Sequence, residues 1–366
     1  MRFAPLPAGL PATVPFVGPE TLERRRGAPF AARLGANESA FGPSPLAARA
    51  MREAVGQVWR YGDSTNHDLT HALAAHHRVA PGNVMVGEGI DGLLGNLVRL
   101  IVAPGDAVVT SDGAYPTFNY HVAGFGGVLH KVPYRDDAED PEALLEAAHA
   151  TGARLVYLAN PDNPMGSWHD APAITALLDR LPGDCLLVLD QAYAEFAPAS
   201  AIPDIAADDP RVIRMRTFSK AYGLAGARIG YALGAPDLIA GFDRIRNHFG
   251  VNRIAQAGAL AALADQGWLA HVVAEVAAAR ERIAAIGAAN GLTALPSATN
   301  FVALDTHRDG AHARALIAAL ADEGVFARMP GVPPLDRCIR ISTAPLHELD
   351  VLEDALPRAL AAISPA

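Results

Sequence analysis

Lysine is almost absent from this chain of 366 residues, which has 28 arginines and only two lysines, Lys131 and Lys220. Arginine carries a positive charge as well as lysine does, but only the lysine amine can lose its proton and form an imine with an aldehyde. A chain that uses arginine almost everywhere else therefore draws attention to the lysines that it keeps. Lys131 follows His130 without any surrounding motif, and we interpret it as a surface residue.

Other scarcities exclude whole classes of protein. No apolar run reaches the roughly 20 residues that span a bilayer, and the proline-rich segment 1–7 lacks the apolar stretch of a secretory signal. We therefore expect no membrane partner. The net charge of −9 argues against a nucleic-acid partner. The two cysteines, Cys185 and Cys338, lie in apolar runs, which predicts buried thiols in a reducing cytoplasm.

Short apolar runs recur along the first two thirds of the chain and alternate with helical segments. These runs lie at 84–86, 107–110, 128–132, 155–158, 186–189 and 212–215. Near-continuous apolar strands of this kind predict an α/β fold, with a mostly parallel sheet between two layers of helices. Ligands of such sheets bind beyond the carboxyl ends of the strands.

The pattern changes near residue 246. An alanine-rich helical region extends to Asn290, strands follow at 301–304 and 338–341, and a last helix begins near Leu346. This part predicts a smaller α+β domain. We therefore expect three parts, which are an N-terminal arm over 1–36 that joins the small domain, a large domain over 37–245 and a small domain over 246–366.

Lys220 has the neighbours of a Schiff-base lysine. It lies in Thr217-Phe218-Ser219-Lys220-Ala221-Tyr222-Gly223, and Arg228 follows eight residues later. The hydroxyls of Thr217 and Ser219 and the guanidinium of Arg228 suit a phosphate group. A lysine beside a phosphate seat predicts pyridoxal 5'-phosphate (PLP), a phosphorylated aldehyde, as the cofactor. A solvated loop lysine is the alternative interpretation.

Two further segments follow strands. Val86-Gly87-Glu88-Gly89-Ile90-Asp91-Gly92 opens a helix, and its free N–H groups form a seat for an anion. Asn160-Pro161-Asp162-Asn163-Pro164-Met165-Gly166 is a rigid turn that can hold an asparagine side chain in a fixed pose. Ordinary turns would explain either segment alone, so neither identifies a site without the others.

Two charged residues lie on strands where a bare charge would be costly. Asp190 ends an apolar strand three residues before Tyr193, and a cationic pyridine nitrogen would satisfy its carboxylate. Arg340 lies within Cys338-Ile339-Arg340-Ile341-Ser342, where a guanidinium suits a bidentate anion such as a substrate carboxylate. Structural ion pairs are the alternative for both residues.

Taken in order, these segments resemble the fold type I PLP-dependent aminotransferases of class I and II, and among them the histidinol-phosphate aminotransferase-like proteins. The resemblance extends from Asn37-Glu38-Ser39-Ala40-Phe41-Gly42-Pro43 to Arg340. It implies a homodimer, a small molecule (an amino acid or histidinol phosphate) as amino donor, and a 2-oxo acid such as 2-oxoglutarate as acceptor. It implies no metal.

The resemblance also assigns roles to single residues. It implies Lys220, Asp190 and Tyr193 as catalytic residues, with Lys220 bonded to the cofactor and Asp190 paired with its ring nitrogen. It implies Arg340, Asn37 and Phe16 as substrate contacts. The cofactor contacts that it implies are Gly89, Ile90, Asp91, Phe118, Asn163, Asp190, Tyr193, Thr217, Ser219, Lys220, Arg228 and, from the other subunit, Tyr61.

The reaction and the donor stay open at this point. Phe118 and Phe16 stand where the histidinol-phosphate enzymes usually have tyrosines, so another donor is possible on the sequence alone. A PLP-dependent decarboxylase or lyase of the same fold is the alternative reaction, because the substrate's pose decides which bond at Cα breaks. A regulator that keeps the fold without turnover is disfavoured by the acidic chain and the complete residue set.

Overall fold

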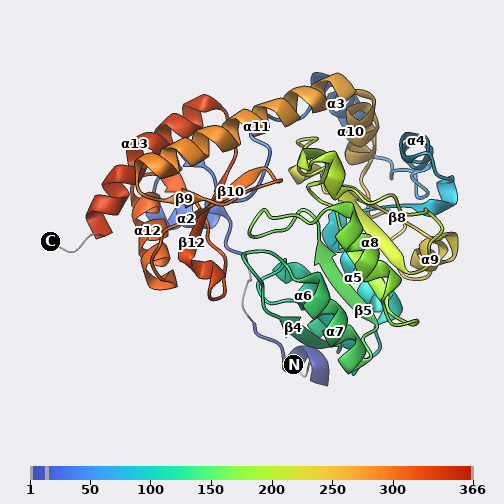
Figure 1. The fold of residues 1–366 in the computed structure, drawn as a ribbon. Coiled ribbons are helices and arrows are strands. Elements are labelled where there is room, and N and C mark those ends of the chain that lie inside the picture. The colour runs from blue at the N-terminus through green and yellow to red at the C-terminus, as the bar shows by residue number, and fades with distance from the viewer. Residues whose placement is uncertain (1–2, 13–15, 364–366) are drawn as a thin grey trace.

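The computed structural model describes residues 3–12 and 16–363 and divides into a large and a small part (Figure 1). Seven strands form the central sheet of the large part, and its strand order is β2-β8-β7-β6-β5-β3-β4. The strands are β2 (Val84–Gly87), β8 (Gly230–Gly234), β7 (Val212–Thr217), β6 (Leu186–Asp190), β5 (Leu155–Ala159), β3 (Ala107–Ser111) and β4 (Val128–Val132). β8 pairs antiparallel with β2 and β7, and all other neighbouring strands of this sheet pair in parallel.

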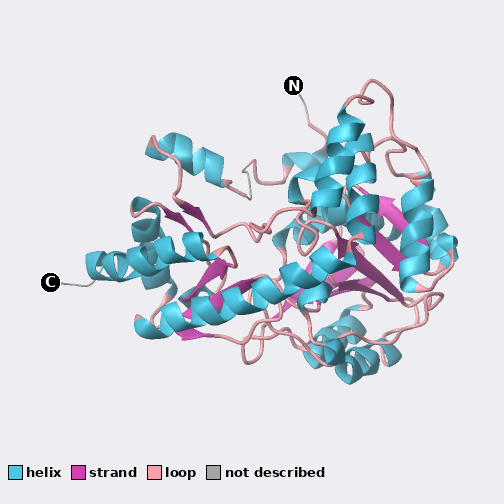
Figure 2. Cartoon of the chain, turned by 90° about the horizontal axis from the view of Figure 1, so that it is seen from above, coloured by secondary structure: helices cyan, strands magenta, loops and turns pink. Residues whose placement is uncertain are grey.

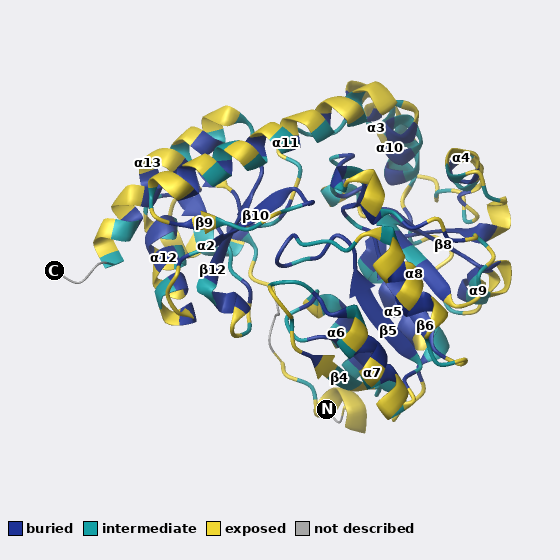
Figure 3. Cartoon of the chain, in the orientation of Figure 1, coloured by how far each residue is buried: buried dark blue, intermediate teal, exposed yellow. Residues whose placement is uncertain are grey.

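Helices cover both faces of this sheet, as the continuous apolar strands predict (Figure 2). Alternate side chains of a strand point to opposite faces. Leu155 and Tyr157 of β5 accordingly pack with α5 (Gly89–Ile101) and α6 (Pro116–Gly124). Val156 and Leu158 pack with α7 (Pro141–Thr151) and α8 (Ala171–Asp179) on the other face. The strands are buried throughout the centre of the large part (Figure 3).

A second group of helices packs beside β2 and β8. It consists of α3 (Pro45–Val55), α4 (His67–His77) and α10 (Arg253–Ala264), while α9 (Pro236–Gly241) follows β8. Among the residues that the structure describes, no helix is both long enough and apolar enough to cross a membrane. The same described residues contain no cluster of three or more His, Cys, Asp or Glu side chains placed to bind a metal ion.

The small part contains two short sheets. The first is the antiparallel sheet β12 (Cys338–Ser342), β10 (Phe301–Asp305) and β9 (Thr293–Ala294). In the second, β1 (Ala32–Arg33) pairs in parallel with β11 (Val325–Phe326), which attaches the N-terminal arm to this part. The helices here are α2 (Pro19–Arg26), α11 (Gln266–Ala289), α12 (Gly310–Asp322) and α13 (Leu346–Ile363), while α1 (Pro5–Ala8) lies apart from them near the N-terminus (Figure 1).

The boundaries of the expected three-part division stay a prediction, and the packing bears on one of them. Val251, Ala255 and Ala259 pack in the same cluster as Leu73 and Tyr231 of the large part. Ile283 and Ile286, near the end of α11, pack instead in the core of the small part. We therefore propose that the change between the two domains lies within α11 rather than at residue 246.

Candidate active site

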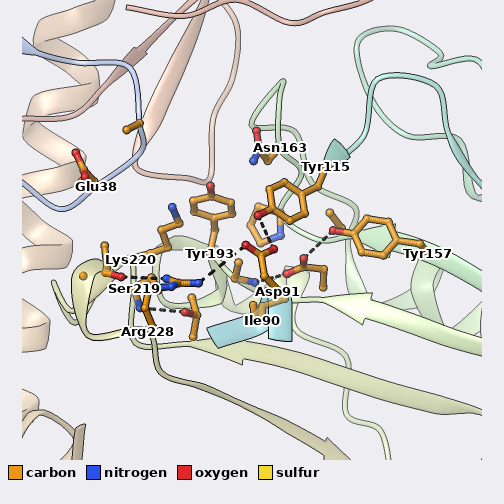
Figure 4. Close-up of a pocket in the computed structure, with 18 residues that line it drawn as sticks. Glu38, Ile90, Asp91, Tyr115, Tyr157, Asn163, Tyr193, Ser219, Lys220 and Arg228 are labelled. Atoms are coloured by element: carbon orange, nitrogen blue, oxygen red, sulfur yellow. Dashed lines mark hydrogen bonds and ion pairs between the residues drawn. The ribbon is translucent and has the colours of Figure 1, made fainter. Parts of the chain in front are cut away.

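Nine of the predicted site residues meet at the carboxyl ends of β5, β6 and β7, beside the first turn of α5 (Figure 4). They surround a cavity of about 320 Å³. The predicted residues that line this cavity are Ile90, Asp91, Asn163, Asp190, Tyr193, Thr217, Ser219, Lys220 and Arg228. The fold thus brings together segments that are more than a hundred residues apart in the chain.

Lys220 lies in the loop that follows β7, with its amine on the wall of the cavity. Its Nζ donates a hydrogen bond to the main-chain carbonyl of Asn37 at 3.0 Å and lies 5.6 Å from the ring centre of Tyr193. Burial and, next, the nearby charge of Arg340 lower the pKa of Lys220 to about 8. About a tenth of this amine is therefore in the neutral, reactive form at pH 7, far more than for an ordinary lysine.

Asp190 ends β6 at one end of the cavity. Only 5% of its surface is exposed, and its carboxylate accepts hydrogen bonds from the Tyr157 hydroxyl at 2.7 Å and the Ala192 N–H at 2.9 Å. Burial raises its pKa to about 6, although these two donors oppose the shift. The group is still mostly ionised at pH 7, so a buried negative charge faces the cavity and suits a cationic ligand atom.

The other end of the cavity suits an anion. The N–H groups at the start of α5 have no partner within the helix, and Ser219 and Arg228 lie against that helix start. Gly89 has a φ of +79°, and a Cβ at this position would lie 2.6 Å from Nη2 of Arg228. The absence of a side chain at Gly89 therefore lets the guanidinium of Arg228 lie directly over the first turn of α5.

Arg340 reaches the site from β12 of the small part. Its Nη1 donates to Oδ1 of Asn163 at 2.5 Å, and its Cζ lies 5.0 Å from the ring centre of Phe301. Burial lowers the pKa of Arg340 to about 10. Asn37 lies alongside, where its Nδ2 donates to the hydroxyl of Tyr193 at 3.1 Å. Arg340 and Asn37 thus contact residues of the cavity wall without lining it.

Two aromatic residues of the segment around α6, Tyr115 and Phe118, lie differently with respect to the cavity. Phe118 is fully buried and stacks on Tyr157, with 4.6 Å between ring centres, and it does not line the cavity. Tyr115 lines the cavity instead, and its hydroxyl donates to Oδ1 of Asp91 at 2.7 Å. Pro116 begins α6, so Tyr115 directly precedes the helix. Phe118 lies in the first turn of α6 and is buried in the core. The cofactor contact predicted for Phe118 therefore stays a prediction, and Tyr115 is a second aromatic residue at the cavity.

The two remaining predicted residues lie outside the cavity of the single chain. Phe16 is 44% exposed, and Cζ of Arg328 lies 4.1 Å from its ring centre. Tyr61 is 77% exposed and packs on Phe249 with 4.8 Å between ring centres.

Sequence reasoning also missed three residues of this region. Tyr157 donates to Asp190 and Tyr115 donates to Asp91, and Arg328 pairs with Arg340 across a β-bridge. A tyrosine directly before the proline that begins a helix was a usable signal for Tyr115. Nothing in the local sequence distinguishes Tyr157 from a core residue of its strand.

The residues present fit PLP. The cavity offers an anion seat at the start of α5, a carboxylate at the opposite end and a reactive amine on the wall between them. PLP has a phosphate, a basic ring nitrogen and an aldehyde, which need these same three partners. Gly89 in particular leaves room for Arg228 beside the phosphate seat.

Comparison with known proteins agrees with this geometry. Residues 32–358 match the model of the family described as aminotransferase class I and II. The chain belongs to this family. The histidinol-phosphate aminotransferase of Anaeromyxobacter sp. (strain Fw109-5) is 38% identical over 358 residues, 97% of this chain and 98% of the relative. The aromatic amino acid aminotransferase of Mycolicibacterium paratuberculosis is 35% identical over 336 residues, 88% of this chain and 92% of the relative.

A solved structure is similar over almost the whole chain. It is the histidinol-phosphate aminotransferase from Sinorhizobium meliloti in complex with pyridoxal-5'-phosphate, with 57% identity and a TM-score of 0.96. The match covers 99% of this chain and 98% of that one. The predicted fold type I architecture, the predicted aminotransferase and the predicted PLP cofactor are thereby confirmed.

Proposed function

We propose that this aminotransferase takes the amino group from histidinol phosphate and passes it to a 2-oxo acid such as 2-oxoglutarate. The observation that carries this proposal is a pair of arginines beside the cavity. Histidinol phosphate has a phosphate ester where an amino acid has its α-carboxylate. A doubly charged phosphate is best bound by two guanidinium groups, whereas one is enough for a carboxylate.

Arg328 and Arg340 form such a pair. The N–H of Arg340 donates to the carbonyl of Arg328 at 2.6 Å, and the two residues form an antiparallel bridge. Directly opposed residues of antiparallel strands project to the same face. Nε of Arg340 is buried and has no hydrogen-bond partner among the described residues. This N–H group is therefore free to bind an oxygen of the substrate's anionic group.

The hydroxyl groups that the sequence lacks do not weigh against this donor. Phe118 is packed behind the cavity, so a tyrosine there would not face a substrate in this geometry. Tyr115 supplies a hydroxyl on the cavity wall. Phe16 supplies an aromatic face beneath Arg328, whose Nη2 is also held by the carbonyl of Val17 at 2.8 Å. These contacts hold the Arg328 guanidinium in place before a substrate binds, which supports its proposed role in an anion site.

We propose the following roles for the residues of the cavity. Bound PLP supplies an electron-accepting ring for the bond that breaks at the substrate's Cα. Asp190 holds a proton on the ring nitrogen, because a nearby negative charge favours the cationic form. Lys220, as a neutral amine, would take the proton from Cα and deliver it to C4′, the aldehyde carbon of the cofactor. Asn163 and Tyr193 hold the ring's phenolic oxygen.

The phosphate of PLP is assigned to the opposite end of the cavity. Its proposed partners are Thr217, Ser219, Arg228 and the main-chain N–H groups of Ile90 and Asp91 at the start of α5. A helix N-terminus and a guanidinium both favour negative charge. This end of the cavity therefore fixes the cofactor's position, while the chemistry takes place beside Lys220.

We further propose that two copies of the chain form the active unit. Trp59 and Tyr61 are 76% and 77% exposed, and Val58 and Phe249 are also more than half exposed. A large exposed apolar surface of this kind is typical of a contact with another protein chain. We assign this surface to the interface and Tyr61 to the phosphate of the cofactor in the other copy.

A comparison of donors tests the choice of substrate. Values of kcat/KM with 2-oxoglutarate as acceptor would be measured for histidinol phosphate, phenylalanine and histidine, in the native enzyme and in Arg328→Ala. We expect histidinol phosphate to be preferred, and Arg328→Ala to lower kcat/KM for this donor by about 10- to 100-fold, the value of a charge-assisted hydrogen bond. An equal loss for all three donors would refute the role of Arg328 in phosphate binding.

A further inference from the structure

The position of Asn163 depends on the loop that carries it. This loop follows β5 and has irregular backbone from Asn160 to the start of α8. Asn163 lines the cavity, whereas Asp162 is 2% exposed and does not line it. Figure 4 shows Asn163 on the side of the site away from Arg228. Consecutive side chains of the loop thus have different roles, and Asp162 is turned into the protein.

Asp162 ties this loop together. Its Oδ1 accepts a hydrogen bond from the hydroxyl of Tyr134 at 2.8 Å, and its Oδ2 accepts from the N–H of Met165 at 3.0 Å. Its own N–H donates to the carbonyl of Ser167 at 2.8 Å. These bonds close the turn around Asn163 from both sides and join it to a segment that lies outside the loop.

Tyr134 connects the loop to the small part. It follows β4, and its ring packs with Met165, Leu335 and Cys338. Close by, Arg337 forms a bidentate ion pair with Asp137, with contacts of 2.7 and 3.0 Å. Tyr134 and Asp162 therefore lie where the loop of Asn163, the segment after β4 and the segment that leads into β12 meet. Arg340 is a residue of this same strand β12.

A carboxylate at this position is costly. Burial raises the pKa of Asp162 to about 7, while the Met165 N–H, the Tyr134 hydroxyl and the charge of Arg340 oppose the shift. Glu139, another buried carboxylate, adds to the cost and is itself bound by Ser111 and the N–H of Ala159. Well-packed apolar residues are often no less stable than buried charges. The stability of the fold therefore gives little reason for an aspartate at position 162. The two hydrogen bonds that its carboxylate accepts, from Tyr134 and Met165, give a better one.

We propose that Asp162, held by Tyr134, is a positioning residue that fixes Asn163 between the cofactor and Arg340. The inference rests on the proposed function, because it takes Asn163 as a contact of the cofactor. Asp162 touches neither cofactor nor substrate and acts only through Asn163, whose Oδ1 accepts from Arg340. When the bond to Tyr134 is lost, the turn loosens and Asn163 leaves its place in part of the molecules.

The variant Tyr134→Phe tests this inference, because it removes one hydroxyl and keeps the ring in its cluster. Tyr231→Phe is the matched control. Tyr231 is 1% exposed, its hydroxyl is bonded to Nε2 of His77 at 2.9 Å, and it does not line the cavity. Both variants lose one buried hydrogen bond, so similar losses of thermal stability are expected. Any difference between the two variants in PLP binding or in the cofactor band then reflects where the hydrogen bond was lost and not a loss of stability.

Three properties would be measured in both variants, namely the dissociation constant for PLP, the pH midpoint of the visible cofactor band and kcat/KM for the donor. We expect Tyr134→Phe to lower kcat/KM by about 3- to 10-fold, the effect of one buried hydrogen bond. We also expect it to weaken PLP binding and to move the midpoint, with no such change in Tyr231→Phe. Asp162→Asn should reproduce the changes of Tyr134→Phe. Equal behaviour of Tyr134→Phe and Tyr231→Phe would overturn the inference.

A double-variant cycle identifies the route of the effect. If Asp162 and Tyr134 act through Asn163, adding Tyr134→Phe to Asn163→Ala changes kcat/KM and the band no further. If Tyr134→Phe lowers kcat/KM by the same factor with and without Asn163→Ala, the inference is contradicted, even if each single variant is impaired. A native protein without a Lys220-dependent cofactor band would instead refute the proposed function. Failure of the inference about Asp162 can therefore be distinguished from failure of the proposed function.

Discussion

Gly89 gives a sharp test of the phosphate seat. Replacing it with alanine adds one methyl group, whose carbon would lie 2.6 Å from Nη2 and 3.1 Å from Cζ of Arg228. Contacts this short force the guanidinium to move. The backbone φ of +79° adds a second cost of about 1–2 kcal/mol, because side chains other than glycine's disfavour the left-handed region. The displacement of Arg228 should weaken binding of the cofactor, and the unfavourable backbone conformation should lower the stability of the fold.

The control variant Gly291→Ala separates these two effects. Gly291 has a similar φ of +75° but nothing within 4 Å of an added Cβ. Both variants should therefore lose similar stability in thermal unfolding of the cofactor-free protein. Only Gly89→Ala should weaken PLP binding, by about 10- to 100-fold, the value of a hydrogen bond to a charged group. The dissociation constant would be measured by titrating cofactor-free protein with PLP, and equal constants in the two variants would refute the seat.

Three further predictions follow from the same site. Because burial lowers the pKa of Lys220 to about 8, the neutral amine rises from about a tenth at pH 7 to about nine tenths at pH 9. The rate at which cofactor-free protein captures PLP should rise about 10-fold over this interval and then level off; a continued rise beyond pH 10 would indicate an ordinary lysine. Arg340→Ala should raise KM for 2-oxoglutarate by about 10- to 100-fold, and an unchanged KM would contradict its role. Tyr61→Ala and Lys220→Ala should each be impaired alone, and an equimolar mixture that has exchanged subunits should recover about a quarter of native activity, because about half of its dimers are mixed and each of these has one native site. No recovery on mixing would contradict the shared site.

Most of the large sheet could be predicted from the sequence, because its strands are short and apolar throughout. β8 could not, since Gly230–Gly234 begins and ends with glycine and directly follows the Lys220 motif. It is also the antiparallel strand, and the sequence contains no local signal for strand direction. β1, β9 and β11 span only two residues each. Their pairing depends on contacts between distant segments rather than on local pattern.

The residues of the site likewise divide into those that local sequence motifs identify and those that only the folded structure reveals. Motifs around Lys220, Asp190 and Asn163 are local, so the sequence identifies them and the fold brings them to one cavity. The cavity wall itself depends on helix orientation, which decides that Tyr115 faces the cavity while Phe118 packs on Tyr157. A sequence gives the spacing of these rings but not the angle at which the helix leaves the sheet.

The half-reaction tests the central claim most directly. Purified enzyme with PLP would be mixed with histidinol phosphate in the absence of a 2-oxo acid, and the visible band of the cofactor followed in native protein and in Lys220→Ala. The account predicts that the native band bleaches and returns when 2-oxoglutarate is added, while Lys220→Ala shows no such cycle. A native band that persists with histidinol phosphate, or an unimpaired cycle in Lys220→Ala, would contradict it.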